Sequence, residues 1–293
     1  MSSERPLGEV FDDVADDYDQ VRAGYPIEIV ASALDRGRLA PGSRVLEVGC
    51  GTGKLTEVLV DLGLRVDAVD PGVRMIAAAR RRLRSPDRVT FHVGRFEDVT
   101  LPDSSFDAAF SATAFHWLDA RVSWLRVASS LRSGGLLALV THMTLHDERS
   151  AEGEARFRAL LREYAPAAAE RHSPPRDLET LMSGARRRSG NASEVWDWVM
   201  GDGRHNLVNA EAARLFQAVD ITAIVSEVER TADELLAHFR TTSLYFQIDP
   251  DKRSAFDADD RRRIEAAGGS VPFSEAVVLM TAQRSNAPVA PSD

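Results

Sequence analysis

A short glycine-rich stretch between two apolar segments is the feature that most constrains this chain. Residues 45–53 read VLEVGCGTG, and Asp70 ends the next apolar segment, VDAVD. An apolar strand ending at Val48, a glycine-rich turn and the amphipathic stretch KLTEVLVDLG predict strand, tight turn and helix in succession. Amides at a helix start can face a ligand, glycines let the backbone approach it, and a carboxylate can accept two ribose hydroxyls. The pattern therefore predicts a site for a nucleoside-bearing cofactor.

The spacing of the glycines separates three kinds of loop. A dinucleotide-binding loop, G-x-G-x-x-G, would need a glycine where Lys54 stands, and a phosphate-binding P-loop would need a glycine at Val48 and Ser or Thr at Leu55. What remains is E-x-G-x-G-x-G, in which Glu47 precedes the glycines. An acid there suits a positively charged or amine-bearing group and repels a pyrophosphate. An ordinary glycine-rich bend is the plainer alternative. The loop residues are Gly49, Cys50, Gly51 and Gly53.

Beyond Asp70, apolar and helix-like segments alternate. RVTFHVG, SFDAAFSA and LLALVTH read as strands, and residues 119–132 as a helix. This alternation predicts a parallel sheet with right-handed crossovers and helices on both faces. Ligands of such sheets lie at the carboxyl ends of the strands. Glu47, Asp70, the loop 94–98 and the stretch from Ser111 all fall at those ends, so we expect them to form one site.

The E-x-G-x-G-x-G loop resembles the first motif of the class I S-adenosylmethionine-dependent methyltransferases. Two further segments extend the resemblance, over about residues 10–141, to the group similar to trans-aconitate methyltransferase. They are a YD…R…YP pattern (Tyr18, Arg22, Tyr25, Pro26) and AFHW at Ala114–Trp117. The resemblance implies an α/β fold, a seven-stranded Rossmann-like sheet with helices on both faces and a helical cap insertion. It also implies S-adenosylmethionine as the cofactor.

The resemblance assigns a role to each segment at the sheet edge. Asp70 is expected to bind the ribose hydroxyls, and Met75 to pack on the adenine. After the third strand, Arg95 replaces the acid usual in the family, so the Phe96 amide and the Glu97 carboxylate are the expected adenine contacts. The remaining expected cofactor contacts are Tyr18, Arg22, Glu47, Gly49, Cys50, Gly51, Gly53, Pro71 and Ser111.

The AFHW stretch adjoins the transferable methyl group in the family. His116 is therefore expected to orient the substrate or to accept its proton, since an unperturbed pKa of about 6.5 suits a base at neutral pH. The alternative is a hydrogen-bonded histidine that packs beneath the methionine part of the cofactor. The residues expected to line the substrate are Tyr25, Trp117, Trp196 and Thr242.

The C-terminal half is expected to complete the sheet and to cover the substrate. ITAIVSEVER and VVLMTAQR are expected to pair as an antiparallel hairpin, and the alternating Trp196 and Trp198 suggest a strand. The expected parts are an N-terminal helical lid (1–40), the S-adenosylmethionine-binding core (41–141), a substrate cap insertion (142–220), the C-terminal part of the core sheet (221–284) and a disordered tail (285–293).

Composition limits the partners. A net charge of −9 argues against nucleic acid or an anionic membrane surface. Cys50 is the only cysteine, which excludes an intramolecular disulfide and favours a reducing compartment. The sequence has no secretory h-region and no apolar run of membrane-spanning length. We expect a cytoplasmic protein without a metal site, and no oligomeric state is predicted.

The function expected from these features is methyl transfer from S-adenosylmethionine to a small-molecule acceptor, at a carboxylate or hydroxyl oxygen. A carboxylate acceptor needs no base because it is already ionised, whereas a hydroxyl acceptor does. The alternatives are a natural-product methyltransferase that acts on nitrogen or carbon, and a protein that binds S-adenosylmethionine without transferring its methyl group.

Overall fold

The computed structural model describes residues 7–205 and 214–286. Residues 1–6 of the expected lid, 206–213 of the expected cap and 287–293 of the expected tail lie outside the described residues. The chain divides into two compact units. The core unit comprises Gly24–His142, Leu181–Ile224 and Val277–Asp293, and the second unit comprises Met1–Ala23, Met143–Thr180 and Val225–Ala276. The lid, cap and tail assigned to parts of the sequence stay predictions.

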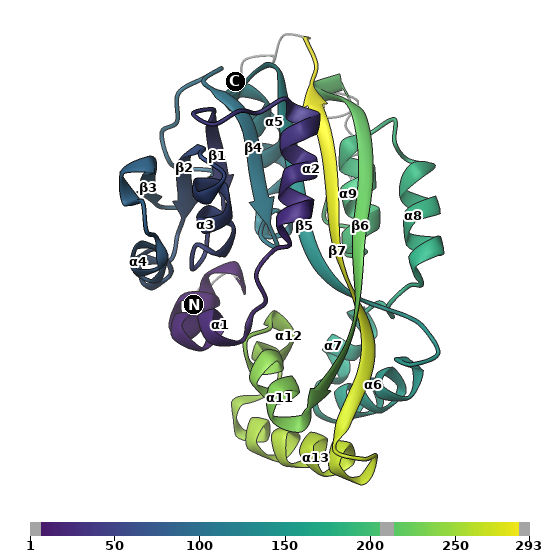
Figure 1. Cartoon of the computed structure of the whole chain (residues 1–293). Coiled ribbons are helices and arrows are strands. Elements are labelled where there is room, and N and C mark those ends of the chain that lie inside the picture. Colours follow the sequence, from purple (N-terminus) through teal and green to yellow (C-terminus); the bar gives the residue numbers. More distant parts are fainter. Residues whose placement is uncertain (1–6, 206–213, 287–293) are drawn as a thin grey trace. The chain divides into compact units, whose positions relative to one another are not determined.

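A mixed sheet of seven strands, counted over the described residues, has the order β3-β2-β1-β4-β5-β7-β6 (Figure 1). β1 is parallel to its neighbours β2 and β4, and β3 and β5 continue the parallel pairing outward. The strand order therefore reverses at β1, and the carboxyl ends of five parallel strands share one edge. The strands are β1 (Arg44–Val48), β2 (Arg65–Asp70), β3 (Val89–Val93), β4 (Phe106–Ala112), β5 (Leu131–Leu145), β6 (Phe216–Thr231) and β7 (Ser270–Arg284).

Helices cover the parallel strands of the core unit. Ile29, Leu55 and Ile76, one from each of three helices, belong to one apolar cluster with strand residues. Trp124 and Val127 are buried on a further helix, α5, which lies behind the sheet in the view of Figure 1. The helices wholly or mainly in this unit are α2 (Ile27–Gly37), α3 (Lys54–Asp61), α4 (Val73–Arg82), α5 (Ala120–Ser130), α8 (Leu178–Arg186) and α9 (Ala192–Met200), with the 3-10 turns η2 (Pro86–Arg88) and η3 (Phe115–Trp117). The predicted seven-stranded α/β fold is confirmed.

The prediction of a strand at Trp196 and Trp198 is wrong, because both residues lie in α9. The Asn191 side chain caps this helix by accepting a hydrogen bond from the Ser193 amide. The apolar residues buried along it, Val195, Trp196 and Val199, follow helical spacing. Two tryptophans two positions apart fit a strand equally well when they are considered alone.

The second unit is built around aromatic and aliphatic side chains, among them Leu160, Phe239 and Phe256. A capping box starts its helix α11, where Thr231 and Glu234 bond each other's backbone amides. Its helices are η1 (Leu7–Val14), α1 (Ala15–Val21), α6 (Ala151–Tyr164), α7 (Pro166–Arg171), α11 (Ala232–Arg240), α12 (Ser243–Phe246), η4 (Pro250–Lys252) and α13 (Arg253–Ala266). Among the residues that the structure describes, no helix has the length and apolar character needed to cross a membrane.

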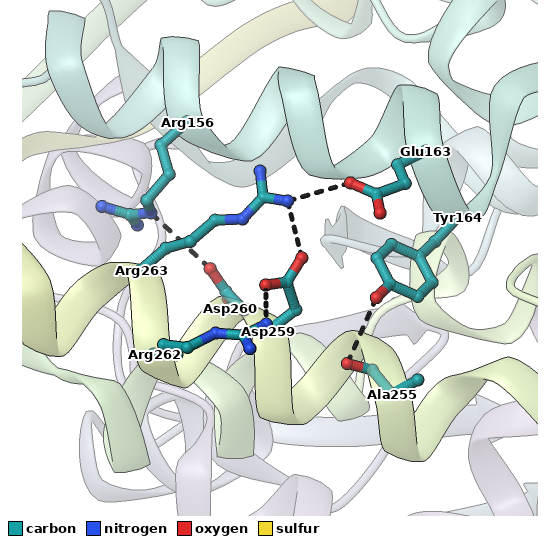
Figure 2. A network of polar contacts seen from close by, with 8 residues as sticks. All are labelled: Arg156, Glu163, Tyr164, Ala255, Asp259, Asp260, Arg262 and Arg263. Carbon is teal, nitrogen blue, oxygen red and sulfur yellow. Dashed lines mark hydrogen bonds and ion pairs between the residues drawn. The ribbon is translucent and has the colours of Figure 1, made fainter.

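Ion pairs join α6 to α13 (Figure 2). Arg263 bridges Glu163 at 2.9 Å and Asp259 at 2.6 Å. Nearby, Arg156 Nε lies 3.6 Å from Asp260 Oδ1, and both side chains are largely buried. Burial raises the pKa of Asp260 above its ordinary value, and the positive charge of Arg156 opposes that rise. The Arg156–Asp260 pair therefore matters more to the second unit than its exposed pairs do.

Replacement of Arg156 by leucine should destabilise the protein, because it leaves the buried Asp260 without its cation. We expect Arg156→Leu to lower the free energy of unfolding by about 3 kcal/mol in urea titrations. The matched control is Arg262→Leu on α13, whose side chain is 73% exposed where it pairs with Asp259. That control should change stability by less than about 0.5 kcal/mol. Equal effects of the two substitutions would contradict this account.

Candidate functional site

The carboxylate of Asp70 lies at the carboxyl end of β2 and holds two backbone amides. Its Oδ2 accepts a hydrogen bond from the Gly51 amide and its Oδ1 one from the Gly72 amide, each at 2.8 Å. The first amide belongs to the glycine loop after β1, and the second precedes α4. Asp70 is 8% exposed. Asp70 therefore orders both segments, and a carboxylate has the kind of oxygen that can accept hydrogen bonds from ligand hydroxyls.

The glycine loop needs glycine for two different reasons. At Gly49, with φ at 74°, an added Cβ would lie 2.3 Å from the Ala114 Cβ, so no side chain fits there. At Gly51, with φ at 52°, an added Cβ would have no atom of a described residue within 4 Å. Gly51 therefore presents bare backbone to open space beside Asp70, which is the property that a closely approaching ligand requires.

Burial controls the ionisation of Glu47. Its side chain is 1% exposed, and its Oε2 accepts a hydrogen bond from Thr56 Oγ1 on α3 at 2.7 Å. Burial raises the pKa of Glu47 to about 8, with a smaller contribution from Asp70, although the bond from Thr56 opposes the rise. Burial and the same two acids raise the pKa of the Cys50 thiol. Glu47 is therefore protonated at neutral pH in the free protein.

The residues expected around the adenine differ in exposure. Met75 on α4 and Phe96 are buried, whereas Pro71 is exposed. Oε1 of Glu97 accepts a hydrogen bond from the Asp119 amide at 2.9 Å and lies 3.7 Å from Arg95. The Glu97 carboxylate is thus bound to the start of α5. The adenine contacts stay predictions.

Of three further expected site residues, Ser111, Trp117 and Trp196, the first two have structural partners of their own. Ser111 Oγ donates to the Val48 carbonyl at 2.7 Å, which joins the ends of β4 and β1. Trp196 is fully buried in α9. Trp117 is half-buried in the same unit, with the Arg204 guanidinium 4.9 Å from its ring centre. The predicted contacts of these three residues with cofactor or substrate stay predictions.

His116 is buried beside other rings in η3. Its side chain is 7% exposed, its ring centre lies 4.7 Å from that of Trp117, and within the described parts of the chain its Nδ1 has no hydrogen-bond partner. Burial lowers the pKa of His116 to about 3, and the charge of Arg204 adds to this effect. The imidazole is therefore neutral at physiological pH and, with this pKa, a weak base.

A second buried histidine, His205, lies against the AFHW stretch and α5. The Trp124 indole donates to Nδ1 of the buried His205 at 3.2 Å, and the His205 ring lies 5.6 Å from that of Phe115. The sequence offered no local signal for His205, because it follows a polar segment and its partners come from the AFHW stretch and α5.

Three expected site residues lie in the second unit: Tyr18, Arg22 and Thr242. Arg22 donates through Nη2 to the Thr241 carbonyl at 2.7 Å and through Nε to its hydroxyl at 3.0 Å. The same guanidinium lies 5.2 Å from the ring centre of Tyr18. Thr242 caps α12. These contacts bind the N-terminal helices to the rest of the second unit, and a cofactor contact for them stays a prediction.

Sequence reasoning missed a polar cluster just beyond the point where the pairing of β4 with β5 ends. The Tyr25 hydroxyl and Thr113 Oγ1 are 3.1 Å apart, and the Tyr25 and His142 rings are 5.1 Å apart. Tyr25 alone was expected in the site. His142 was visible in the sequence as the polar residue that ends LLALVTH, the same kind of signal that identified Asp70.

Comparison with known proteins shows which part of the chain is similar to methyltransferases. The methyltransferase domain family matches residues 46–139, the stretch that holds the glycine loop, Asp70 and the AFHW turn. A candidate type II methyltransferase from Anaeromyxobacter dehalogenans has the same fold, with a TM-score of 0.56 and 24% identity over 92% of this chain and 99% of that one. Residues 46–139 of the core unit therefore match a methyltransferase domain, which supports the resemblance to class I S-adenosylmethionine-dependent methyltransferases.

Curated relatives of this methyltransferase domain match over part of their length. An uncharacterized methyltransferase of Mycobacterium tuberculosis is 40% identical over 147 residues, which are 50% of this chain and 57% of that protein. A malonyl-[acyl-carrier protein] O-methyltransferase of Bacillus cytotoxicus is 35% identical over 129 residues, 43% of this chain and 45% of that protein. The chain thus spans about half the length of these relatives.

The buried Glu47 predicts a dependence of stability on pH. Its pKa is about 8 in the folded protein and near 4.5 when unfolded, so the unfolded chain binds fewer protons between these values. Stability should therefore fall as pH rises, by at most about 1.4 kcal/mol per pH unit. We expect wild type to lose roughly 2 kcal/mol relative to Glu47→Gln between pH 5.5 and 7.5 in urea titrations.

Glu57→Gln is the matched control, because it makes the same substitution on α3, where the side chain is 31% exposed. This variant retains Glu47 and should keep the pH dependence of the wild type. A Glu47→Gln variant that follows the wild-type curve would show that Glu47 ionises normally.

Proposed function

We propose that the chain transfers a methyl group from S-adenosylmethionine to an oxygen of a small molecule. The observation that carries the proposal is the pair of 2.8 Å bonds from the Gly51 and Gly72 amides to Asp70, at the point where the strand order reverses. This arrangement sets a carboxylate beside the open backbone of Gly51, as a ribose with two hydroxyls requires. Relatives described as O-methyltransferases, including those acting on malonyl-[acyl-carrier protein] and in ubiquinone biosynthesis, support oxygen as the acceptor atom.

The residues present fit the cofactor. Bare backbone at Gly51 admits its close approach, Asp70 accepts ribose hydroxyls, and Met75 offers an apolar surface on α4. The cofactor supplies a sulfonium methyl group that is already activated for displacement. The protein's task is therefore to hold the acceptor oxygen in line with that group and to exclude water. His116, with its pKa near 3, would orient an acceptor as a neutral imidazole.

The proposal is tested by calorimetric titration of the protein with S-adenosylmethionine and S-adenosylhomocysteine. We expect both to bind the wild type, and Asp70→Asn to weaken binding at least about tenfold, since asparagine retains one acceptor oxygen but loses the charge. The matched control is Asp67→Asn in the same strand, where the carboxylate bonds Arg44 and His92 instead of the loop.

Asp67→Asn should leave both affinities within about threefold of the wild type. Circular dichroism establishes that each variant is folded before titration. Absence of binding by the folded wild-type protein would contradict the proposed function, as would equal losses in the two variants.

A further inference from the structure

Tyr25, Thr113 and His142 form a polar cluster beside the glycine loop. The Thr113 amide donates to the Val140 carbonyl at 2.8 Å, which ties the end of β4 to β5. Because side chains alternate along a strand, His142 shares a face of β5 with Val140, and Val140 belongs to the apolar cluster against which Tyr25 packs. Tyr25 therefore contacts both Thr113 and His142, each of which lies just beyond the last paired residues of β4 and β5, Ala112 and Val140.

The backbone of Thr113 is strained at this place. Its φ is 52°, in the left-handed region that a β-branched residue rarely adopts. The next residue, Ala114, fills the space that a side chain at Gly49 would need. Thr113 thus follows the strand directly at the loop that would hold the cofactor, with its hydroxyl 3.1 Å from that of Tyr25. Strain of this kind persists where the surrounding structure enforces it, and such positions concentrate at functional sites.

The chemistry of the cluster differs from that of a carboxylate-binding site. Its three side chains carry two hydroxyls and one imidazole, none with a permanent positive charge, whereas carboxylates are held best by arginine or lysine. Two hydroxyls and an imidazole suit an acceptor that itself carries a hydroxyl group, and the neighbouring rings of Tyr25 and His142, 5.1 Å apart, favour an aromatic one. An imidazole next to such an acceptor also meets its need for a base, which the buried His116, with a pKa of about 3, meets poorly.

We propose that Tyr25, Thr113 and His142 bind a phenolic hydroxyl acceptor, with His142 as its base. The proposal rests on the proposed methyltransferase function. The phenol O–H bond breaks and its proton passes to an imidazole nitrogen of His142, while the oxygen forms a bond to the sulfonium methyl carbon. The S–CH3 bond breaks and its electron pair stays on sulfur, giving S-adenosylhomocysteine. The proton then leaves His142 for water.

The three monohydroxybenzoates are the probes, since each carries both a phenol and a carboxylate. Incubation with S-adenosylmethionine is followed by mass spectrometry of the methylated product. We expect a methoxybenzoate, the ether, from at least one isomer. His142→Gln should lower kcat at least about a hundredfold, the range of general-base catalysis. His142→Ala should recover activity when free imidazole is added, and Tyr25→Phe should raise KM.

The control is His146→Gln, at an exposed histidine four residues further along the chain, which should leave kcat within twofold. Calorimetry with S-adenosylhomocysteine separates the two proposals, because His142→Gln should bind it as the wild type does. A methyl ester as the product, no product from a protein that binds S-adenosylmethionine, or full activity of His142→Gln would overturn the hydroxyl-acceptor proposal. Failure to bind S-adenosylmethionine would instead overturn the proposed function itself.

Discussion

The carboxylate of Asp70 connects parts of the core unit that the sequence keeps apart. It ends β2, accepts the Gly51 amide of the loop after β1, and accepts the Gly72 amide that precedes α4. The Val69 carbonyl adds bonds from the Gly49 and Cys50 amides at 2.8 and 3.1 Å. Hydrogen bonds to the Val69 carbonyl and to the Asp70 carboxylate thus hold the glycine loop to the end of β2. The bond to Asp70 fixes the Gly51 backbone, although Gly51 has no side chain and faces open space. The proposed site depends on this fixed backbone.

Burial then decides which polar groups near the loop are charged. Glu47, with a pKa of about 8, and His116, with a pKa of about 3, are both neutral at physiological pH, because each would lose hydration by ionising where it lies. A glutamate is ordinarily negative and a histidine can be positive at neutral pH. The charge of the site therefore differs from what these two residue types suggest. In the proposed mechanism, Asp70 holds the ribose and His142 takes the proton, while the activated methyl group needs only orientation. The two proposals therefore place ribose binding at the end of β2 and proton transfer within β5, just beyond its last pair with β4.

Much of the fold was predictable because its signals are local. Glycine spacing, the acid that ends VDAVD and the alternation of apolar segments depend on residues a few positions apart, and they placed the loop and Asp70 correctly. Contacts between residues far apart in the sequence were not predictable in this way. Thr113 meets Tyr25 from 88 positions away because the segment before α2 packs on the same apolar cluster as Val140 of β5. The spacing of the two tryptophans in α9 fits the periodicity of a strand as well as that of a helix. The burial that shifts the pKa values of Glu47 and His116 depends on the packing of the whole core.

The most direct test of the central claim is the crystal structure of the protein with S-adenosylhomocysteine. The account predicts that both ribose hydroxyls lie within hydrogen-bond distance of the Asp70 carboxylate, about 2.5–3.0 Å, with the ligand passing over the Gly51 backbone. The Gly51 and Gly72 amides should keep their bonds to the same carboxylate. A ligand bound elsewhere in the core unit, or a ribose held by other groups while Asp70 contacts only the two amides, would contradict it.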